Sequence, residues 1–315
     1  MTKKILCIGE AMVELSLGSG DDISLGFAGD TLNTAIYLKR FFGESAQVSY
    51  CTVLGTDPLS DRLVNFIESE SIDTSTISRS EQRGVGIYSI STDANGERTF
   101  NYWRDNSAAR TLFTDGVFNT LHGFDVIYFS AITLAILPDN VRLKLLEKLA
   151  ILRTESNTLV AFDSNYRPAL WESKSAAKAI IDKAWSITDI ALPSVDDELA
   201  IFEEANEAAV LTRFNNYSVT AGALKRGAAG PLSLGQNTQE EVNITYPSAK
   251  KVVDSTAAGD SFNAGFLYTW LADNDHSGAL LTGHNCAATV IGYAGAIVPM
   301  DSWRASGRDA YSSIQ

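Results

Sequence analysis

Residues 252–267 read Val-Val-Asp-Ser-Thr-Ala-Ala-Gly-Asp-Ser-Phe-Asn-Ala-Gly-Phe-Leu. Two β-branched residues lead into a run of small residues, and a segment that reads as a helix follows. The lack of bulk at Ala257, Ala258 and Gly259 lets a ligand approach the backbone. The first amides of a helix have no intrahelical acceptor, and the helix dipole favours negative charge there. This stretch therefore predicts a helix whose N-terminus can bind a phosphate group.

Asp260 lies where these amides are expected to point. Two interpretations fit a carboxylate at this place. It can be a charge partner of the helix N-terminus, which is a common role for Asp. It can also be a base beside a bound phosphoryl group. The residue type alone favours a charge partner of the helix. The surrounding sequence pattern makes the catalytic base a stronger alternative.

The composition restricts the possible functions. The chain has 315 residues, 45% of them hydrophobic and 20% charged, as in ordinary globular α/β proteins. A net charge of −13 argues against partners such as nucleic acid or an anionic membrane. We expect no membrane span and no signal peptide. Three scattered cysteines fit a reduced, cytoplasmic protein without disulfides or a zinc site.

Short apolar runs alternate with helical patterns along the chain. Each run reads as a strand buried on both faces of a parallel sheet, and residues 138–153 between two of them have helical spacing. The alternation predicts βαβ units and an α/β fold with a doubly wound, mostly parallel sheet. Ligands of such sheets bind beyond the carboxyl ends of the strands. The runs are residues 5–8, 126–129, 159–162, 190–192 and 217–224.

Residues 85–92 and 97–104 are rich in β-formers and are joined by Asp93-Ala94-Asn95-Gly96, which is a hairpin signal. Strand alternation puts Tyr102 and Arg104 on one face of this hairpin. An exposed amphipathic sheet accounts for these residues without any ligand. Residues 12–17 alternate more loosely and are expected to form a strand outside the main sheet.

Two segments resemble the signatures of the PfkB, or ribokinase-like, family of sugar kinases. Residues 28–33 (Ala-Gly-Asp-Thr-Leu-Asn) resemble its N-terminal signature, and residues 254–267 resemble its C-terminal signature. Segments such as 9–16, 96–104 and 165–168 are most similar to bacterial 2-keto-3-deoxygluconate (2-dehydro-3-deoxygluconate) kinases. The resemblance covers nearly the whole chain.

This resemblance implies one ribokinase-like α/β domain over residues 1–315, with a small β-sheet lid from strands at about 11–28 and 84–106. It implies a kinase that uses ATP and Mg²⁺ to phosphorylate 2-keto-3-deoxygluconate, an Entner–Doudoroff reaction, with Asp260 as general base. The amides of Ala257, Ala258 and Gly259 would stabilise the moving phosphoryl group. Substrate contacts are implied for Gly29, Asp30, Asn33, Tyr88, Tyr102, Arg104 and Arg167. Nucleotide contacts are implied for Asn165, Lys225, Gly227, Gly230 and Asn285.

The acidic run Asp196, Asp197 and Glu198 follows another strand end. Many family members have Asn-x-x-Glu here, which helps to place Mg²⁺ and the phosphates. The Asn is missing in this chain, so these three acids are candidates to hold the metal through water. A solvated acidic helix N-terminus is the open alternative.

Arg104 and Arg167 favour a sugar acid over a neutral sugar. The planar guanidinium can bind both oxygens of a carboxylate, and a neutral sugar would leave such arginines unpaired. The alternative is a fructokinase or another family kinase of a neutral sugar, and a catalytically silent sugar-acid sensor is a third possibility. Because exposed lid strands have edges that invite pairing, we expect a homo-oligomer, with a lid-to-lid dimer as the simplest form.

Overall fold

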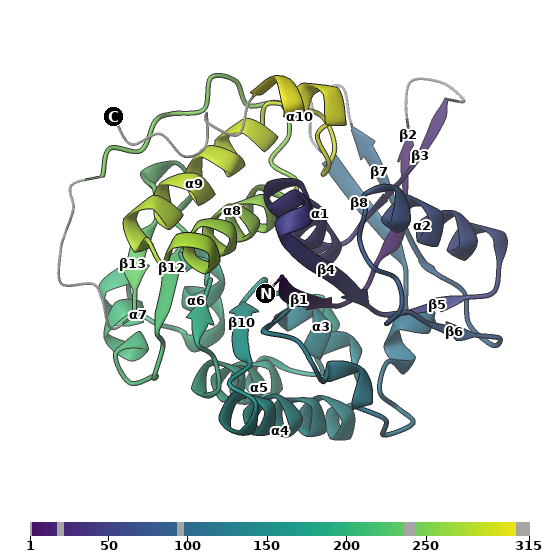
Figure 1. Cartoon of the computed structure of the whole chain (residues 1–315), viewed down its shortest axis with the longest axis horizontal. Coiled ribbons are helices and arrows are strands. Elements are labelled where there is room, and N and C mark those ends of the chain that lie inside the picture. The colour runs from purple at the N-terminus through teal and green to yellow at the C-terminus, as the bar shows by residue number, and fades with distance from the viewer. Residues whose placement is uncertain (1, 18–21, 93–97, 236–243, 307–315) are drawn as a thin grey trace.

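The computed structural model describes residues 2–17, 22–92, 98–235 and 244–306. A seven-stranded sheet in the order β13-β12-β11-β10-β9-β1-β4 lies at its centre (Figure 1). Its strands pair in parallel, except that β12 and β13 are antiparallel. The strands are β1 (Lys3–Ile8), β4 (Ala46–Cys51), β9 (Val126–Ser130), β10 (Leu159–Asp163), β11 (Ile190–Ala191), β12 (Ala221–Leu224) and β13 (Leu232–Leu234).

Helices cover both faces of this sheet, which confirms the predicted α/β class (Figure 1). One face carries α1 (Asp30–Phe42), α2 (Pro58–Ser69), α8 (Ala258–Asp273), α9 (His276–Val290) and α10 (Met300–Ser306). The other face carries α3 (Ala131–Ile136), α4 (Asp139–Glu155), α5 (Lys174–Ser186), α6 (Val195–Phe202) and α7 (Glu207–Phe214).

The alternation of side chains along the strands produces two hydrophobic cores. In β1, Leu6 and Ile8 pack into the core that contains α3–α7, whereas Ile5 and Cys7 pack into the core that contains α1, α8 and α9. All four side chains are fully buried. A strand covered on both faces needs apolar residues at every position, which is why a continuous apolar run predicted it correctly.

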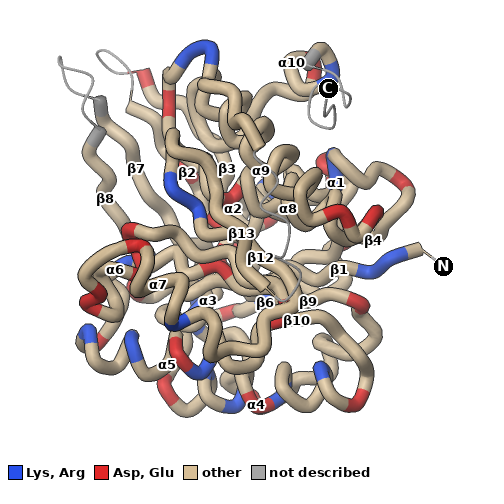
Figure 2. The backbone as a smooth tube through the Cα atoms, turned by 90° about the vertical axis from the view of Figure 1, so that its left-hand side faces the viewer, with Lys and Arg blue, Asp and Glu red and all other residues tan. Residues whose placement is uncertain are grey.

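A separate four-stranded sheet in the order β3-β2-β7-β8 extends away from the body of the molecule (Figure 2). The predicted strand at residues 12–17 and the two hairpin strands are confirmed. The hairpin tip predicted at residues 93–96 lies outside the described residues. The strands are β2 (Met12–Leu17), β3 (Ile23–Ala28), β7 (Gly86–Thr92) and β8 (Arg98–Trp103), and a two-stranded sheet consists of β5 (Val53–Gly55) and β6 (Ser78–Ser80).

The predicted strand at residues 217–224 is wrong in its first half. The Tyr217 amide donates to the Phe214 carbonyl oxygen at 3.1 Å and so completes the turn after α7. The strand begins at Ala221, where parallel pairing with β11 becomes possible. The residue types at 217–220 fit a strand, but these residues form the turn that follows α7 and so cannot pair with β11.

The surface carries acidic and basic residues that are interspersed along α4–α7 rather than gathered by sign (Figure 2). No helix in the described part of the chain is both long and apolar enough to cross a bilayer. Cys7, Cys51 and Cys286 are free and buried. Burial raises the pKa of all three thiols, that of Cys51 to about 12.

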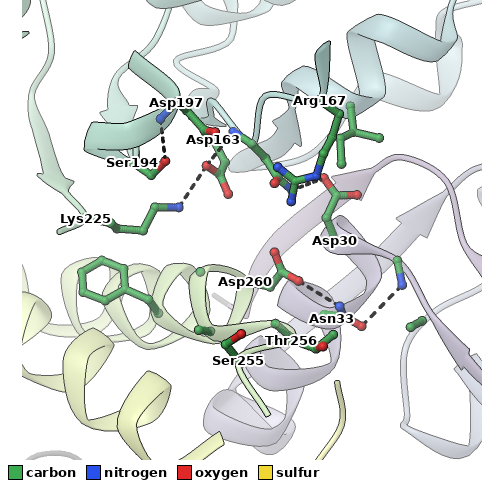
Figure 3. Close-up of a pocket in the computed structure, with 18 of the residues that line it drawn as sticks. Asp30, Asn33, Asp163, Arg167, Ser194, Asp197, Lys225, Ser255, Thr256 and Asp260 are labelled. Carbon is green, nitrogen blue, oxygen red and sulfur yellow. Dashed lines mark hydrogen bonds and ion pairs between the residues drawn. The ribbon is translucent and has the colours of Figure 1, made fainter. Parts of the chain in front are cut away.

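The carboxyl ends of the parallel strands meet at one edge of the central sheet. Ser130 ends β9 and Asp163 ends β10, and the two residues pair in register. Lys225 directly follows β12 at the same edge. The N-terminal ends of α1 and α8 lie there too, so polar strand ends face two helix N-termini (Figure 3).

Candidate active site

A cavity of about 880 Å³ opens at this edge, with the small sheet forming part of its wall. Its size is typical of a site for small-molecule ligands. The cavity brings together most of the predicted site residues. They are Gly29, Asp30, Asn33, Tyr88, Tyr102, Arg104, Asn165, Arg167, Asp196, Asp197, Lys225, Gly227, Ala257, Ala258, Gly259 and Asp260.

The N-terminus of α8 forms one wall of the cavity. Ala257 precedes the helix in the left-handed conformation, with φ of 60°, which residues with a Cβ rarely adopt. The Ala258 amide donates to the Ser255 carbonyl oxygen at 3.2 Å, so it is not the free donor that the sequence predicted. The amides of Gly259 and Asp260 have no acceptor among the described residues. These two are the amides free to bind an anion.

The Asp260 carboxylate faces the cavity from this helix end (Figure 3). Its Oδ2 accepts a hydrogen bond from Asn33 Nδ2 at 2.8 Å. Burial raises the pKa of Asp260 to about 8; the charges of Asp30 and Asp163 also raise it, while the Asn33 bond and Lys225 lower it. A carboxylate whose pKa lies near neutrality is suited to accept a proton.

Asp30 lies close to Asp260 and has two donors of its own. Its Oδ2 accepts from Asn165 Nδ2 at 3.0 Å and from the Ser130 hydroxyl. Burial raises the pKa of Asp30. Asn165 was predicted to contact the nucleotide, but in the structure its side-chain amide contacts a residue at the predicted sugar end.

The two arginines predicted to bind a carboxylate have different surroundings. Arg104 is buried, and its Nε and Nη2 both donate to Glu10 Oε2, from Nε at 2.8 Å. Without a ligand Arg104 is therefore paired, so the prediction that a neutral sugar would leave it unpaired is wrong. Arg167 is exposed, donates to the Tyr166 carbonyl oxygen at 3.0 Å, and forms no ion pair within the described part of the chain. Its charge acts on Asp197: burial raises the pKa of Asp197, and Arg167 opposes that rise.

The remaining predicted sugar contacts also have protein partners. The Tyr88 hydroxyl donates to the Glu14 carboxylate, and the Tyr88 ring stacks on Tyr102 with centroids 5.7 Å apart. The Gly29 amide donates to Asn33 Oδ1 at 3.4 Å, so this predicted substrate donor is already engaged. A Cβ at Gly29 would lie 2.2 Å from the Glu10 carbonyl oxygen, which explains why glycine is needed there.

Two functional candidates were not assigned from the sequence: Asp163, which lines the cavity, and Asn263, which is buried behind its wall. Asp163 Oδ1 lies 2.9 Å from Lys225 Nζ, and Asn263 Oδ1 lies 3.0 Å from the same nitrogen. Both residues could have been found from the sequence. Asp163 ends a buried strand at the ligand-binding edge, and Asn263 is three residues after Asp260 on the same helix.

The acidic run after β11 divides into two parts. Asp196 and Asp197 line the cavity, and the Asp197 amide donates to Ser194 Oγ at 3.3 Å. Glu198 is fully buried outside the cavity wall, pairs with Arg213 Nη2 at 2.6 Å, and has a pKa that burial raises to about 7. It is therefore not a metal candidate. Among the described residues, no three His, Cys, Asp or Glu side chains group as metal ligands.

Two predicted nucleotide contacts also lie outside the cavity lining. Gly227 lines the cavity, but Gly230 packs behind it, where a Cβ would lie 2.2 Å from the Tyr246 ring. Asn285 does not line the cavity, whereas its neighbours His284 and Ala287 on α9 do. The face of α9 that meets the cavity carries His284 and Ala287, and Asn285 lies beside that face.

The family model described as pfkB family carbohydrate kinase matches residues 2–303. The chain belongs to the pfkB family of carbohydrate kinases. The 2-dehydro-3-deoxygluconokinase of Escherichia coli K12 is 41% identical over 96% of this chain and 99% of its own length. The fructokinase of Salmonella typhimurium is 26% identical, with 87% and 86% of the two chains covered.

Solved structures of pfkB kinases share the fold. The 2-dehydro-3-deoxygluconokinase of Thermotoga maritima gives a TM-score of 0.80 at 20% identity, over 94% of this chain and 96% of that one. The fructokinase of Vibrio cholerae, solved with fructose, ADP and a calcium ion, gives a TM-score of 0.81 at 19% identity, over 99% of both chains. The predicted ribokinase-like fold and membership of a sugar kinase family are confirmed.

Proposed function

We propose that this pfkB kinase transfers the γ-phosphoryl group of ATP to the primary hydroxyl of 2-keto-3-deoxygluconate and produces the 6-phosphate. The observation that carries the proposal is the Asp260 carboxylate at a helix N-terminus with free amides, inside a cavity that also contains Arg167. The 41% identity to a 2-dehydro-3-deoxygluconokinase over nearly the whole chain supports the choice of substrate.

Each residue at the end of α8 has a separate role in the reaction. The Asp260 carboxylate accepts the hydroxyl proton while the hydroxyl oxygen bonds to the γ-phosphorus and the bond to the ADP oxygen breaks. Asn33 holds that carboxylate in place at 2.8 Å. The amides of Gly259 and Asp260 stabilise negative charge on the phosphoryl oxygens, and one such donor contributes about 3 kcal/mol.

Mg²⁺ supplies charge neutralisation on the phosphates when it is bound. Asp196 and Asp197 fit this ion as outer ligands, because Mg²⁺ keeps several of its waters. The nucleotide contacts come from Arg226, Gly227, His284 and Ala287, which all line the cavity. These assignments imply a protein that works where ATP is abundant, in the cytoplasm.

Arg167 provides the charge that distinguishes a sugar acid from a neutral sugar. It lines the cavity and forms no ion pair with a carboxylate in the described part of the chain. A substrate carboxylate can therefore accept two parallel N–H bonds from one edge of its guanidinium. Arg104 contributes less to this choice, because Glu10 already neutralises it.

The small sheet closes over the sugar and excludes water from the transferred phosphoryl group. Its outer surface leaves large apolar side chains exposed, among them Ile23 at 63% and Trp103 at 61%. Ile23 lies on β3 and Trp103 on β8, which are the two edge strands of this sheet, and exposed apolar residues on an edge fit pairing with a second copy of the chain. A lid-to-lid homodimer is therefore part of the proposal, and sedimentation of the purified protein tests it.

A coupled ADP-release assay over a panel of sugars tests the function. We expect the highest kcat/KM with 2-keto-3-deoxygluconate, and values at least 100-fold lower with fructose and ribose. Arg167→Gln should lower kcat/KM for the sugar acid about 100-fold and leave that for fructose unchanged. A preference for fructose would replace the proposal by its alternative, a fructokinase. Equal losses for both substrates would remove Arg167 from carboxylate recognition.

A further inference from the structure

A cation lies beside the first turn of α8. A Cβ placed on Gly259 would lie 3.6 Å from Lys225 Nζ, so the ammonium lies against the backbone at this turn. The amides of Gly259 and Asp260 lack an acceptor in the described part of the chain. An anion bound to these amides therefore lies within reach of the Lys225 ammonium (Figure 3).

Two buried side chains hold this ammonium in place. Nζ donates to Asp163 Oδ1 at 2.9 Å and to Asn263 Oδ1 at 3.0 Å. Asn263 Nδ2 in turn donates to Asp163 Oδ2 at 2.6 Å and to the Tyr128 hydroxyl at 3.0 Å. Asp163, Asn263 and Tyr128 are buried, and a satisfied buried network fixes the positions of its members.

The ammonium has one donor left for a ligand. A lysine ammonium carries three protons, and the two bonds to Asp163 and Asn263 use two of them. No third acceptor for Nζ is present among the described residues, and Lys225 lines the cavity. The position of the third proton, next to the free amides of α8, suits an oxygen of the group that moves between ATP and the sugar.

We propose that Lys225 is a catalytic residue whose ammonium contacts the phosphoryl group during its transfer, and that Asp163 is the positioning residue that holds it there. The inference rests on the proposed kinase function and deepens it, because it separates Lys225 from residues that contact the rest of the nucleotide. A cation fixed before the reaction stabilises the charge of the transition state without having to move.

Lys225→Met tests the first half of the proposal, with Lys174→Met as the matched control. Lys174 has an ion pair of the same length, 2.9 Å to Glu203, but lies on the surface away from the cavity. We expect Lys225→Met to lower kcat about 100-fold with less than 3-fold change in the KM of the sugar. Titration calorimetry should show about 10-fold weaker binding of AMP-PNP and unchanged binding of ADP. Lys174→Met should change none of these values.

Equal weakening of ADP and AMP-PNP binding, or an unchanged kcat, would overturn the role of Lys225. A double-mutant cycle tests Asp163 as its positioning residue. Asp163→Asn alone should lower kcat about 10-fold, and in the Lys225→Met background it should lower kcat less than 2-fold. An equal loss in both backgrounds would mean that Asp163 acts through the fold and not through Lys225.

A wrong substrate assignment can be distinguished from a wrong role of Lys225. If the wild type phosphorylates fructose but not 2-keto-3-deoxygluconate, the substrate assignment is wrong, and the same variants are compared with fructose. The comparison of AMP-PNP with ADP needs no sugar, so it tests Lys225 even if no sugar of the panel is phosphorylated.

Discussion

Asp260→Asn should make the folded protein more stable while it abolishes turnover. The carboxylate is buried beside Asp30 and Asp163, with Lys225 and the Asn33 amide as its compensating partners. Its pKa is raised from 3.8 to about 8. Folding therefore favours the protonated form, and the ionised form that the reaction needs is destabilising.

The sign and the size of the effect follow from this pKa. Stability from protonated Asp260 is fully present below pH 4 and is lost as the pH rises to about 8. Each pH unit of that interval corresponds to about 1.4 kcal/mol, which sets an upper limit of about 6 kcal/mol. Water enters the open cavity and reduces the cost of the charge, so we expect Asp260→Asn to raise the free energy of unfolding at pH 8.5 by about 2–4 kcal/mol.

Urea unfolding of the ligand-free wild type and variant at pH 5 and pH 8.5 measures the effect. The stabilisation should be several-fold larger at pH 8.5 than at pH 5. Asp163→Asn is the matched control in the same cavity. Because its loss leaves the Lys225 ammonium without its anionic partner, this variant should be less stable than the wild type at pH 8.5. A less stable Asp260→Asn, or a gain that does not depend on pH, would refute the reasoning.

Three further outcomes are expected. The kcat/KM of the wild type should rise tenfold per pH unit below pH 7, reach half of its maximum near pH 8 and level off above about pH 9, because Asp260 must be ionised to accept a proton; a midpoint near pH 4 would contradict this. Glu10→Gln should lower the free energy of unfolding by about 3 kcal/mol, since it leaves Arg104 buried and unpaired; thermal unfolding measures it, and a change below 0.5 kcal/mol would show that water replaces the carboxylate. Gly29→Ala should destabilise by more than 2 kcal/mol, because its Cβ would lie 2.2 Å from the Glu10 carbonyl oxygen; a variant of wild-type stability would mean that the α1 N-terminus shifts freely.

Much of the fold could be predicted from the sequence, because the central strands are buried on both faces. Runs such as residues 5–8 and 126–129 contain no charged residue, and the Tyr128 hydroxyl, their one strongly polar side-chain group, is hydrogen-bonded inside the molecule. All eight residues are fully buried in strands. Local sequence pattern did not predict the conformation of segments that can form either a strand or a loop. Val252 and Val253 have strand-forming side chains, yet they lie in a loop, exposed by 68% and 41%.

The site was predictable where it depends on sequence spacing and not where it depends on pairing across the fold. Asp260 and the small residues before it lie at a helix N-terminus that the sequence pattern predicted. The partner of Arg104 is Glu10, which is 94 positions away, and that of Lys225 is Asp163, which is 62 positions away. Single-sequence patterns contain no information on such distant pairs, so both cations were assigned to ligands alone.

The burial of all three cysteines makes the protein convenient for testing the proposed closure of the small sheet. Cys7, Cys51 and Cys286 are at most 1% exposed, and burial raises the pKa of each thiol. Maleimide dyes react with accessible thiolates, so the native chain should remain unlabelled. Cysteines introduced by Ser24→Cys on β3 and Ala179→Cys on α5, both at exposed positions, would then carry a fluorophore pair whose separation reports closure in single molecules.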